Sequence, residues 1–409
     1  MSTTTRRGRP ATPSDDLWAS RRRHPTARPV ASPRRSKTYV GLLAVICTLN
    51  LFGLVMVLSA SSVTALYEYG SSWYLFKRQL LWMALGLVAM VVVMRIDYHR
   101  WRRWATPALA LSGVLLALVL VPGVGVEVNG ASRWLGYGAV SLQPSELAKL
   151  TVLVFAADLL ARRAAWMDDL RLTLVPVTVV FGTIALLVMA QPNLGTTLVL
   201  GAIVLSLLWV AGTPLIPLTG LAAAGALAAT ALALWAPYRR ARVLAFLNPM
   251  ADYQNGGYQN VQSLVGIASG GITGTGLGES RAKWGFLPEA HTDFIFAIIG
   301  EELGLIGALF LVSLFVALCV LGSRAALLAP DRFGMLIAAG VTVWFGVQAF
   351  INIGAVIGIL PITGVPLPFV SYGGSSLLFS MIGAGLLLNV ARQAQLRDAP
   401  RRRVAPPAR

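Results

Sequence analysis

Ten runs of apolar residues, each close to the length of a membrane-crossing helix, constrain this chain more than any other feature of its sequence. A helix needs about 20 apolar residues, with roughly 17 to 25 workable, to cross the hydrocarbon layer of a bilayer. Hydrophobic residues make up 56% of the 409 residues and charged residues only 12%, well below the charged fraction of a soluble protein. We therefore expect an all-α polytopic membrane protein. The ten predicted spans are residues 39–60, 79–96, 105–122, 145–161, 172–190, 194–211, 214–236, 300–322, 333–357 and 373–391.

The net charge of +17 is distributed in a way that favours a membrane signal over nucleic-acid binding. Arginines gather in the two tails and in alternate loops between the apolar runs. Cytoplasmic loops carry such an excess of Lys and Arg, and with ten spans all of these segments fall on one side. We expect both termini to be cytoplasmic.

The chain divides into three parts. Residues 1–37 are rich in Arg, Pro, Ser and Thr and are interpreted as a disordered basic cytoplasmic tail. Residues 38–392 form the transmembrane domain, and 393–409 form a second basic cytoplasmic tail. The segment 237–299, between the seventh and eighth spans, is predicted to be a large extracytoplasmic loop, and its many apolar and glycine residues argue against disorder. Cys47 and Cys319 lie inside apolar runs and are interpreted as small packing residues.

Several basic residues fall on the predicted outer side, against the usual charge bias. A long loop crosses the membrane regardless of its charge, which is one explanation. The other is an anionic ligand held beside acidic residues at the membrane surface. The outer basic residues are Arg133, Arg239, Arg240, Arg242, Arg281 and Lys283.

The fourth span carries an unusual pair of charges. Glu146 and Lys149 are three residues apart, so they share one face of a helix and can form an ion pair. One interpretation is a structural pair between helices. The other is a site at the outer mouth of the bundle, with Lys149 about one turn inside and shallow enough to meet a lipid headgroup.

The stretch "LPEAHTDFIFAIIGEELG" (287–304) places acids at the edge of an apolar run. Thr292 or Asp293 is suited to capping a helix start. Alternatively, Asp293 is an ionisable carboxylate at the lipid–water boundary that acts as a general base. Glu301 and Glu302 then line the same cavity or bond to neighbouring helices.

Two other kinds of site are not supported by the sequence. The run "GGITGTGLG" (270–278) lacks the Lys-Ser/Thr ending and βαβ setting of a phosphate-binding loop, so its glycines are expected to allow close packing or backbone approach. His291 is the only outer histidine, which argues against a histidine-rich zinc site. A Mg²⁺ or Mn²⁺ ion held by Asp293 and substrate phosphates stays open, with no certain metal ligand.

Five motifs in order identify a resemblance to the SEDS (shape, elongation, division and sporulation) family of bacterial cell-wall glycosyltransferases. The resemblance covers about residues 39–391, and the long basic N-terminal tail and "PEAHTDFIF" lean towards the division branch of the family. Asn193 stands where the family commonly has Asp. The motifs are "NGASRWLGYGAVSLQPSELAKL" (129–150), "QPNLGTT" (191–197), "FLNPMADYQNGGYQNVQSLVGI" (246–267), "GLGESRAKWGFLPEAHTDFIFAIIGEELG" (276–304) and "GILPITGVPLPFVSYGGSSLL" (358–378).

The resemblance implies a fold of about ten transmembrane helices and an activity. Family members polymerise lipid II, a disaccharide-pentapeptide on undecaprenyl pyrophosphate, at the outer face of the cytoplasmic membrane. The residue matching the family's proposed catalytic carboxylate is Asp293, the expected general base of an inverting transfer. The residues expected to bind the substrate or its pyrophosphate are Arg133, Gln143, Glu146, Lys149, Arg242, Lys283, His291, Ser371 and Gly373, and those expected to support the site are Glu289, Glu301 and Glu302.

The same resemblance implies binding partners, and it leaves open three alternative functions. Expected partners are a class B penicillin-binding protein, which is an FtsI-like transpeptidase, and other divisome proteins at the septum, with no nucleic acid. The alternatives are a lipid II flippase, an elongation polymerase and a division scaffold. A flippase needs polar groups through the depth of the bundle, whereas here they concentrate at the outer end, which favours the enzyme.

Overall fold

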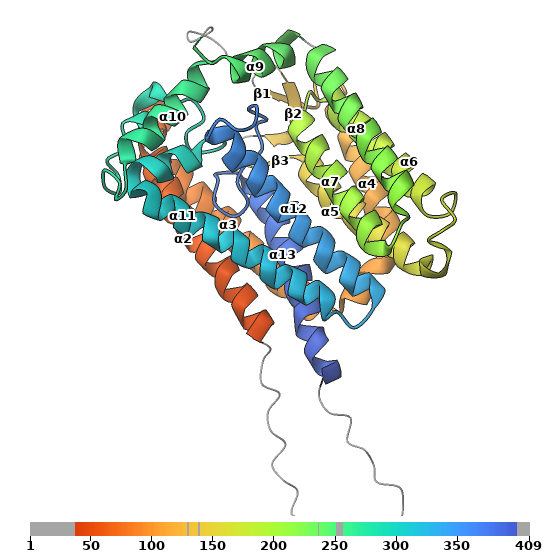
Figure 1. The fold of residues 1–409 in the computed structure, drawn as a ribbon. Coiled ribbons are helices and arrows are strands. Elements are labelled where there is room, and N and C mark those ends of the chain that lie inside the picture. The colour runs from red at the N-terminus through yellow and green to blue at the C-terminus, as the bar shows by residue number, and fades with distance from the viewer. Residues whose placement is uncertain (1–36, 129–130, 138–139, 236, 251–256, 399–409) are drawn as a thin grey trace, which may run out of the picture. The chain divides into compact units, whose positions relative to one another are not determined.

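The computed structural model in Figure 1 describes residues 37–128, 131–137, 140–235, 237–250 and 257–398. The predicted tails fall almost wholly outside these residues, although the last helix continues past the predicted boundary at residue 392. Helices dominate the fold. Their bounds are α2 Lys37–Tyr69, α3 Tyr74–Arg95, α4 Ala105–Val119, α5 Pro144–Arg162, α6 Leu174–Ala190, α7 Leu194–Ala211, α8 Leu215–Trp235, α9 Pro237–Leu247, α10 Tyr258–Gly270, α11 Ile295–Leu327, α12 Arg332–Val356 and α13 Gly374–Asp398.

Each of the ten predicted spans corresponds to one helix, which confirms the polytopic all-α class. Among the described residues, α2, α3, α7, α8, α11, α12 and α13 are long and apolar enough to cross a membrane, and α6 is a shorter apolar helix. The predicted break after residue 211 is real. Gly212 ends α7 with a φ of +93° and donates its N–H to the carbonyls of Leu208 and Trp209.

Helix α11 differs from the prediction because it begins at Ile295 rather than 300 and is interrupted at Gly304, where φ is +64°. The interruption frees backbone groups that the segment 270–276 satisfies. Thr275 N–H donates to Glu301 O at 3.0 Å, and Leu305 N–H donates to Gly271 O at 3.0 Å. A Cβ at Gly270 would lie 2.0 Å from Gly300 O. The glycine run therefore allows close backbone approach, as expected, and keeps the irregular backbone paired.

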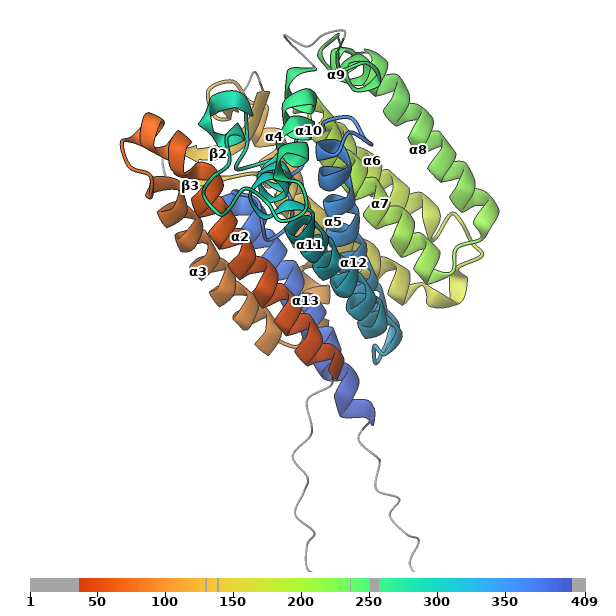
Figure 2. The same ribbon diagram turned by 60° about the vertical axis from the view of Figure 1, so that its left-hand side comes forward.

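The segment predicted as one large outer loop is partly helical, because its apolar residues pack against the bundle. It contains α9, α10, a single kinked turn at Ala282–Phe286 and the first turn of α11. These elements gather at the end of the bundle opposite the start of α2 and the end of α13 (Figures 1 and 2). The two described ends of the chain thus lie at one end of the bundle.

A small antiparallel sheet at the same end of the bundle as α9 and α10 connects α4 to α5. Its strands are β1 Val126–Val128, β2 Ala131–Tyr137 and β3 Val140–Leu142, in the order β1-β2-β3. The register pairs Glu127 with Ser132 and Gly136 with Ser141. This sheet carries Arg133 and leads directly into the helix that holds Glu146 and Lys149.

Helices α12 and α13 form the centre of the bundle. Helix α12 packs against α5, α7 and α11, and α13 packs against α3. Helix α8 lies at the periphery with only Leu218 buried, and Figure 2 shows it at the edge of the bundle. The expectation that both cysteines are packed is wrong for Cys47, which is exposed on α2, while Cys319 is half-buried.

Candidate functional site

Asp293 lies in the turn that precedes α11 and does not cap that helix. The first residue before the helix is Phe294, and no side chain caps its N-terminus. The Thr292 hydroxyl instead donates to the Glu289 carboxylate at 2.8 Å. The interpretation of Thr292 or Asp293 as a helix cap is therefore wrong, and the Asp293 carboxyl is left for another role.

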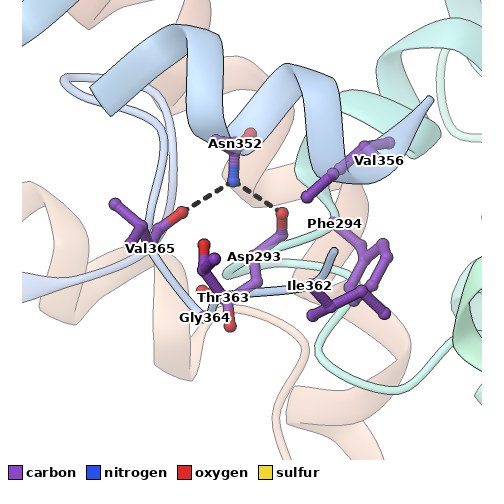
Figure 3. Close-up of a pocket in the computed structure, with 9 residues that line it drawn as sticks. Asp293, Phe294, Asn352, Val356, Ile362, Thr363, Gly364 and Val365 are labelled. Atoms are coloured by element: carbon purple, nitrogen blue, oxygen red, sulfur yellow. Dashed lines mark hydrogen bonds between the residues drawn. The ribbon is translucent and has the colours of Figure 1, made fainter. Parts of the chain in front are cut away.

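A small cavity lies beside Asp293, with about 190 Å³ of empty space, part of it open to solvent. Figure 3 shows Asp293 facing the loop between α12 and α13, beside Thr363 and Gly364. A Cβ added to Gly364 would lie 3.4 Å from Asp293 Oδ2. Among the residues that the structure describes, no group donates a hydrogen bond to the Asp293 carboxylate. The remaining lining residues are Phe294, Asn352, Ala355, Val356, Ile362 and Val365.

The surroundings of Asp293 raise the pKa of its carboxyl from 3.8 to about 7. Burial among protein atoms is the largest cause, and the negative charge of Glu289 adds to it. The positive charges of Arg242 and Arg133 act in the opposite direction. A carboxyl with a pKa near 7 is suited to accept a proton at neutral pH.

Arg133 is held at the site by backbone carbonyls. Its Nε donates to Gln191 O at 3.0 Å and its Nη2 to Pro192 O at 2.8 Å. The Gln191 side chain is in turn anchored, because its Nε2 donates to Leu116 O at 3.0 Å. The "QPNLGTT" motif therefore positions an arginine through its own backbone.

Asn193, the departure from the family's usual Asp, has a local role in this motif. It precedes α7, and its Oδ1 accepts from Thr196 N–H at 3.2 Å. Asn and Asp cap helices about equally well. The substitution therefore retains the helix cap and removes only a charge.

Two further predicted residues, Arg242 and His291, lie on α9 and in the turn that carries Asp293. Arg242, on α9, donates from Nη1 to Ile362 O at 3.4 Å, so it bridges α9 to the loop that faces Asp293. The pKa of His291 is lowered, mainly by burial, with Glu289 and Glu68 acting against that. The lowered pKa of His291 favours its neutral imidazole form, which is suited to hydrogen bonding rather than to charge pairing.

Lys149 is enclosed in the bundle and does not reach a lipid headgroup, contrary to the shallow placement predicted for it. Its side chain is 1% exposed, and its ammonium bonds to Glu146 Oε1 at 2.8 Å, which confirms the predicted pair. The ammonium also donates to Gln348 Oε1 at 2.8 Å and lies 5.1 Å from the Trp344 ring centroid. This cluster joins α5 to α12 beneath the outer mouth of the bundle.

Gln143, Ser371 and Gly373 make hydrogen bonds at the start of α5 and in the segment that leads into α13. Gln143 N–H donates to Ser375 Oγ at 3.3 Å, which links the start of α5 to the start of α13. Ser371 Oγ accepts from Leu367 N–H at 2.8 Å, so its hydroxyl oxygen holds its own loop together. Gly373 N–H donates to Gln79 Oε1 at 3.3 Å.

Lys283, Glu301 and Glu302 form a separate buried cluster, and none of the three lines the Asp293 cavity. Lys283 is 5% exposed and pairs with Glu302 at 3.2 Å. Glu302 also accepts from Ser59 Oγ at 2.6 Å, which reaches α2. Glu301 accepts from Arg281 N–H at 2.8 Å. The contacts of these residues join the outer loop to the bundle.

The remaining arginines of the segment 237–299 are not among the residues that line the Asp293 cavity. Arg240 and Arg281 are exposed, and the side chain of Arg239 lies outside the described residues. No group of three or more His, Cys, Asp or Glu side chains gathers in the described part of the chain. A divalent cation on Asp293 would take its other ligands from water, backbone carbonyls or a bound phosphate.

Sequence reasoning missed the polar residues of α12. Trp344, Gln348 and Asn352 are spaced four apart, so they lie on one face of the helix. Gln348 Nε2 donates to Pro366 O, and Asn352 Nδ2 donates to Val365 O, both at 2.8 Å. The signal in the sequence was two amide side chains inside an apolar span, since polar residues in the membrane are rarely there without a role.

Comparison with known sequences assigns the chain to a family. A family model described as cell cycle protein, and named for FtsW, RodA and SpoVE, matches residues 40–396. The chain is 43% identical over 361 residues to stage V sporulation protein E of Bacillus subtilis, covering 88% of this chain and 99% of that protein. It is 46% identical over 351 residues to the probable peptidoglycan glycosyltransferase FtsW of Mycobacterium tuberculosis, covering 86% and 67%.

Solved structures show the same fold. A chain from a structure described as "Structural coordination of polymerization and crosslinking by a peptidoglycan synthase complex" matches with a TM-score of 0.71 and 31% identity, covering 87% of this chain and 98% of that one. The rod shape determining protein RodA of Thermus thermophilus matches with a TM-score of 0.64 and 30% identity, covering 86% and 96%.

The fold and the site define a multi-pass helical membrane protein with a carboxyl of raised pKa at one end of its bundle. The chain belongs to the FtsW/RodA/SpoVE family of cell cycle proteins, which is the SEDS family that its motifs predicted.

Proposed function

We propose that this protein is a peptidoglycan glycosyltransferase that polymerises lipid II at the outer face of the bacterial cytoplasmic membrane during division. The observation that carries the proposal is the Asp293 carboxyl, which has a pKa of about 7 and no hydrogen-bond donor among the described residues. Relatives named probable peptidoglycan glycosyltransferase FtsW support the reaction class. The similar chain from a peptidoglycan synthase complex that coordinates polymerisation with crosslinking supports a transpeptidase partner of the class B penicillin-binding type.

In the proposed reaction, Asp293 takes the proton from a sugar hydroxyl of the acceptor as that oxygen attacks the anomeric carbon of the donor. A new C–O glycosidic bond forms, the bond from the anomeric carbon to the pyrophosphate oxygen breaks, and the configuration inverts. Undecaprenyl pyrophosphate leaves as a stable anion. A second carboxylic acid, which a glycosidase uses to protonate its leaving group, is therefore not required.

Charge stabilisation of the leaving pyrophosphate is assigned to Arg133 and Arg242. Both lie near enough to Asp293 to influence the pKa of its carboxyl, and both are oriented by donation to backbone carbonyls. Preorganised cations of this kind act where negative charge develops in the transition state. The enclosed Lys149 supports the mouth through Gln348 rather than touching the headgroup.

The proposed orientation places the described chain ends in the cytoplasm. At that end of the bundle, Arg102 and Arg162 pair with Asp158 at 2.6 and 2.8 Å. Basic residues concentrate on the cytoplasmic side of membrane proteins. Asp293 then faces the outside, where lipid II presents its headgroup.

The test is to purify the wild type and Asp293→Asn, each with its cognate transpeptidase, and to supply labelled lipid II. We expect moenomycin-insensitive glycan chains from the wild type and a loss of about 10²–10⁴-fold in rate for the variant. Asp97→Asn, which removes a carboxylate at the opposite end of the bundle, is the matched control and keeps the wild-type rate.

Other outcomes separate the alternatives. Equal polymer from the wild type and Asp293→Asn removes Asp293 as the base. No polymer from either, with the partner present, favours a flippase or a scaffold. A flippase moves labelled lipid II across vesicles without polymerising it, whereas a scaffold tolerates neutral substitution at both Asp293 and Lys149. Depletion in cells distinguishes a division role, which gives filaments, from an elongation role, which gives round cells.

A further inference from the structure

Asn352 joins the segment that carries Asp293 to the loop that faces it. Its Nδ2 donates to the backbone carbonyl of Asp293 at 2.7 Å and to that of Val365 at 2.8 Å (Figure 3). Both partners are acceptors, so the bonded atom must be the amide nitrogen, which carries two hydrogens. The NH₂ group of Asn352 thus donates one hydrogen bond to each of two segments that lie far apart in sequence.

Asn352 is enclosed within the bundle. The residue is 3% exposed and sits on α12, one of the two central helices. One turn earlier on the same face, Gln348 donates to the adjacent loop carbonyl, Pro366 O, at 2.8 Å. The loop is therefore held at two consecutive residues by α12, and Asn352 ties the Asp293 carbonyl to the same helix.

The pinned loop is the one that borders the carboxylate. Gly364 directly precedes Val365 and has a φ of +72°, and its Cα faces Asp293 Oδ2 closely enough that a Cβ would lie 3.4 Å away. A shift of either carbonyl held by Asn352 would change the distance between the carboxylate and this loop. It would also change the burial of the carboxylate, which is the main reason for its high pKa.

We propose that Asn352 is a positioning residue for Asp293, which acts by holding the Asp293 backbone against the 361–366 loop. This inference rests on the proposed function, because it assigns Asn352 to the geometry of the general base. It touches no reacting atom. Displacement of a catalytic group by about 1 Å costs on the order of 10²-fold in rate.

A matched control exists at the opposite end of the bundle. Asn389 on α13 is 0% exposed, and its Nδ2 also donates to two backbone carbonyls, those of Val93 at 2.8 Å and Ile96. Replacement by Leu removes both of these donations at either position, at similar volume, and at Asn389 it also removes the bond that Oδ1 accepts from Gln393 Nε2 at 2.8 Å. Asn389→Leu therefore loses more hydrogen bonds than Asn352→Leu, which makes it a demanding structural control, and only Asn352 lies beside Asp293.

The experiment compares Asn352→Leu and Asn389→Leu in the full chain with its cognate transpeptidase. We expect Asn352→Leu to lower kcat by about 10²-fold with little change in KM. We also expect the pH midpoint of kcat to move to lower pH, because a less buried carboxyl returns towards its ordinary pKa. Asn389→Leu should leave kcat and the midpoint unchanged.

Hydrogen exchange followed by mass spectrometry supplies a readout that does not depend on activity. Asn352→Leu should speed exchange in segments 289–296 and 361–370, and Asn389→Leu should not. Asn352→Ser, which retains one donor, should be intermediate in kcat and exchange, and it serves as the second variant if Asn352→Leu does not fold.

Three results would overturn the inference. Wild-type kcat and midpoint in a folded Asn352 variant would remove its positioning role, even if exchange is faster. Equal losses in the Asn352 and Asn389 variants would make both purely structural. Full activity of Asp293→Asn would remove the base itself, and with it the proposed function, whereas an inactive Asp293→Asn beside a fully active Asn352→Leu would reject only the inference.

Discussion

Asp293, just before α11, and the carboxylates of Glu301 and Glu302, within its first turns, have different environments. Glu301 accepts hydrogen bonds from Ser280 Oγ and from the N–H groups of Arg281 and Ala282. Glu302 pairs with Lys283 and also accepts from Ser59. Asp293, about two turns earlier, has only two arginines at a distance and no donor on its carboxylate among the described residues.

The difference teaches how to separate structural from reactive acids in a membrane protein. A carboxylate with several donors is stabilised in its charged form and holds segments together. A carboxylate that is buried without donors keeps a high pKa and can exchange a proton near neutral pH. The count of donors, and not the presence of an acid at the membrane edge, distinguishes Asp293.

The largest change in stability is expected when the ion pair between Lys283 and Glu302 is broken. Lys283→Met leaves Glu302 buried without its cation, which should cost about 3–5 kcal/mol of stability. Chemical unfolding in detergent measures this loss. Lys283→Met combined with Glu302→Gln should recover most of it, because no unpaired charge remains. A stable Lys283→Met that has lost activity would instead make Lys283 a substrate-binding residue.

Asp293→Asn should change stability in the opposite direction. The carboxyl has a pKa of about 7 in the folded protein against an ordinary value of 3.8, so the folded state binds the proton more tightly than the unfolded state. The wild type therefore loses stability as pH rises from about 4 to 7, and the variant does not. We expect the variant to be more stable by about 1–2 kcal/mol at pH 8, after allowance for partial exposure.

Thermal unfolding at pH 4 and pH 8 checks this result. The gap between Asp293→Asn and the wild type should be small at pH 4 and constant above pH 7. A gap that is the same at both pH values would mean that Asp293 is not buried without donors.

The pH dependence of the polymerisation rate tests the raised pKa of Asp293 directly, and the expected shifts of its midpoint are small. The rate should rise about tenfold per pH unit below 7 and level off above it, because only the ionised carboxyl accepts a proton. Glu289→Gln removes a charge that raises the pKa of Asp293 and should move the midpoint to lower pH by up to about one unit. Arg242→Gln should move it higher. With Asp97→Asn as the unshifted control, a midpoint near 4 in the wild type would show that the pKa of the titrating carboxyl is not raised.

The smallest effect is expected at Gly364. Gly364 and Gly212 both have positive φ, at +72° and +93°, so alanine at either position should cost about 1–2 kcal/mol. Only at Gly364 would the new Cβ meet Asp293, since nothing lies within 4 Å at Gly212. Gly364→Ala should therefore lower the polymerisation rate and Gly212→Ala should not. Similar rates in the two variants would show that the loop does not constrain the carboxylate.

Much of the fold was predictable because a continuous run of apolar residues identifies a membrane helix without reference to the rest of the chain. Each apolar run became a helix, and α7 matches its predicted bounds at both ends. The Glu146–Lys149 pair was predictable for the same reason, since three residues on one helix fix the distance between side chains. The start of α11 was misplaced because the predicted span was limited to the length of one membrane crossing, whereas the helix runs for 33 residues from Ile295.

The sequence by itself determined the helical membrane class, the family motifs and the presence of acids close to basic residues along the chain. Only the tertiary structure decided which acid is free of donors, because the donors to Glu301 and Glu302 come from a loop that folds back on α11. It also decided that Lys149 meets Gln348 and that Asn352 holds Asp293. These contacts join segments 199 and 59 residues apart, and helical periodicity carries no information over such separations.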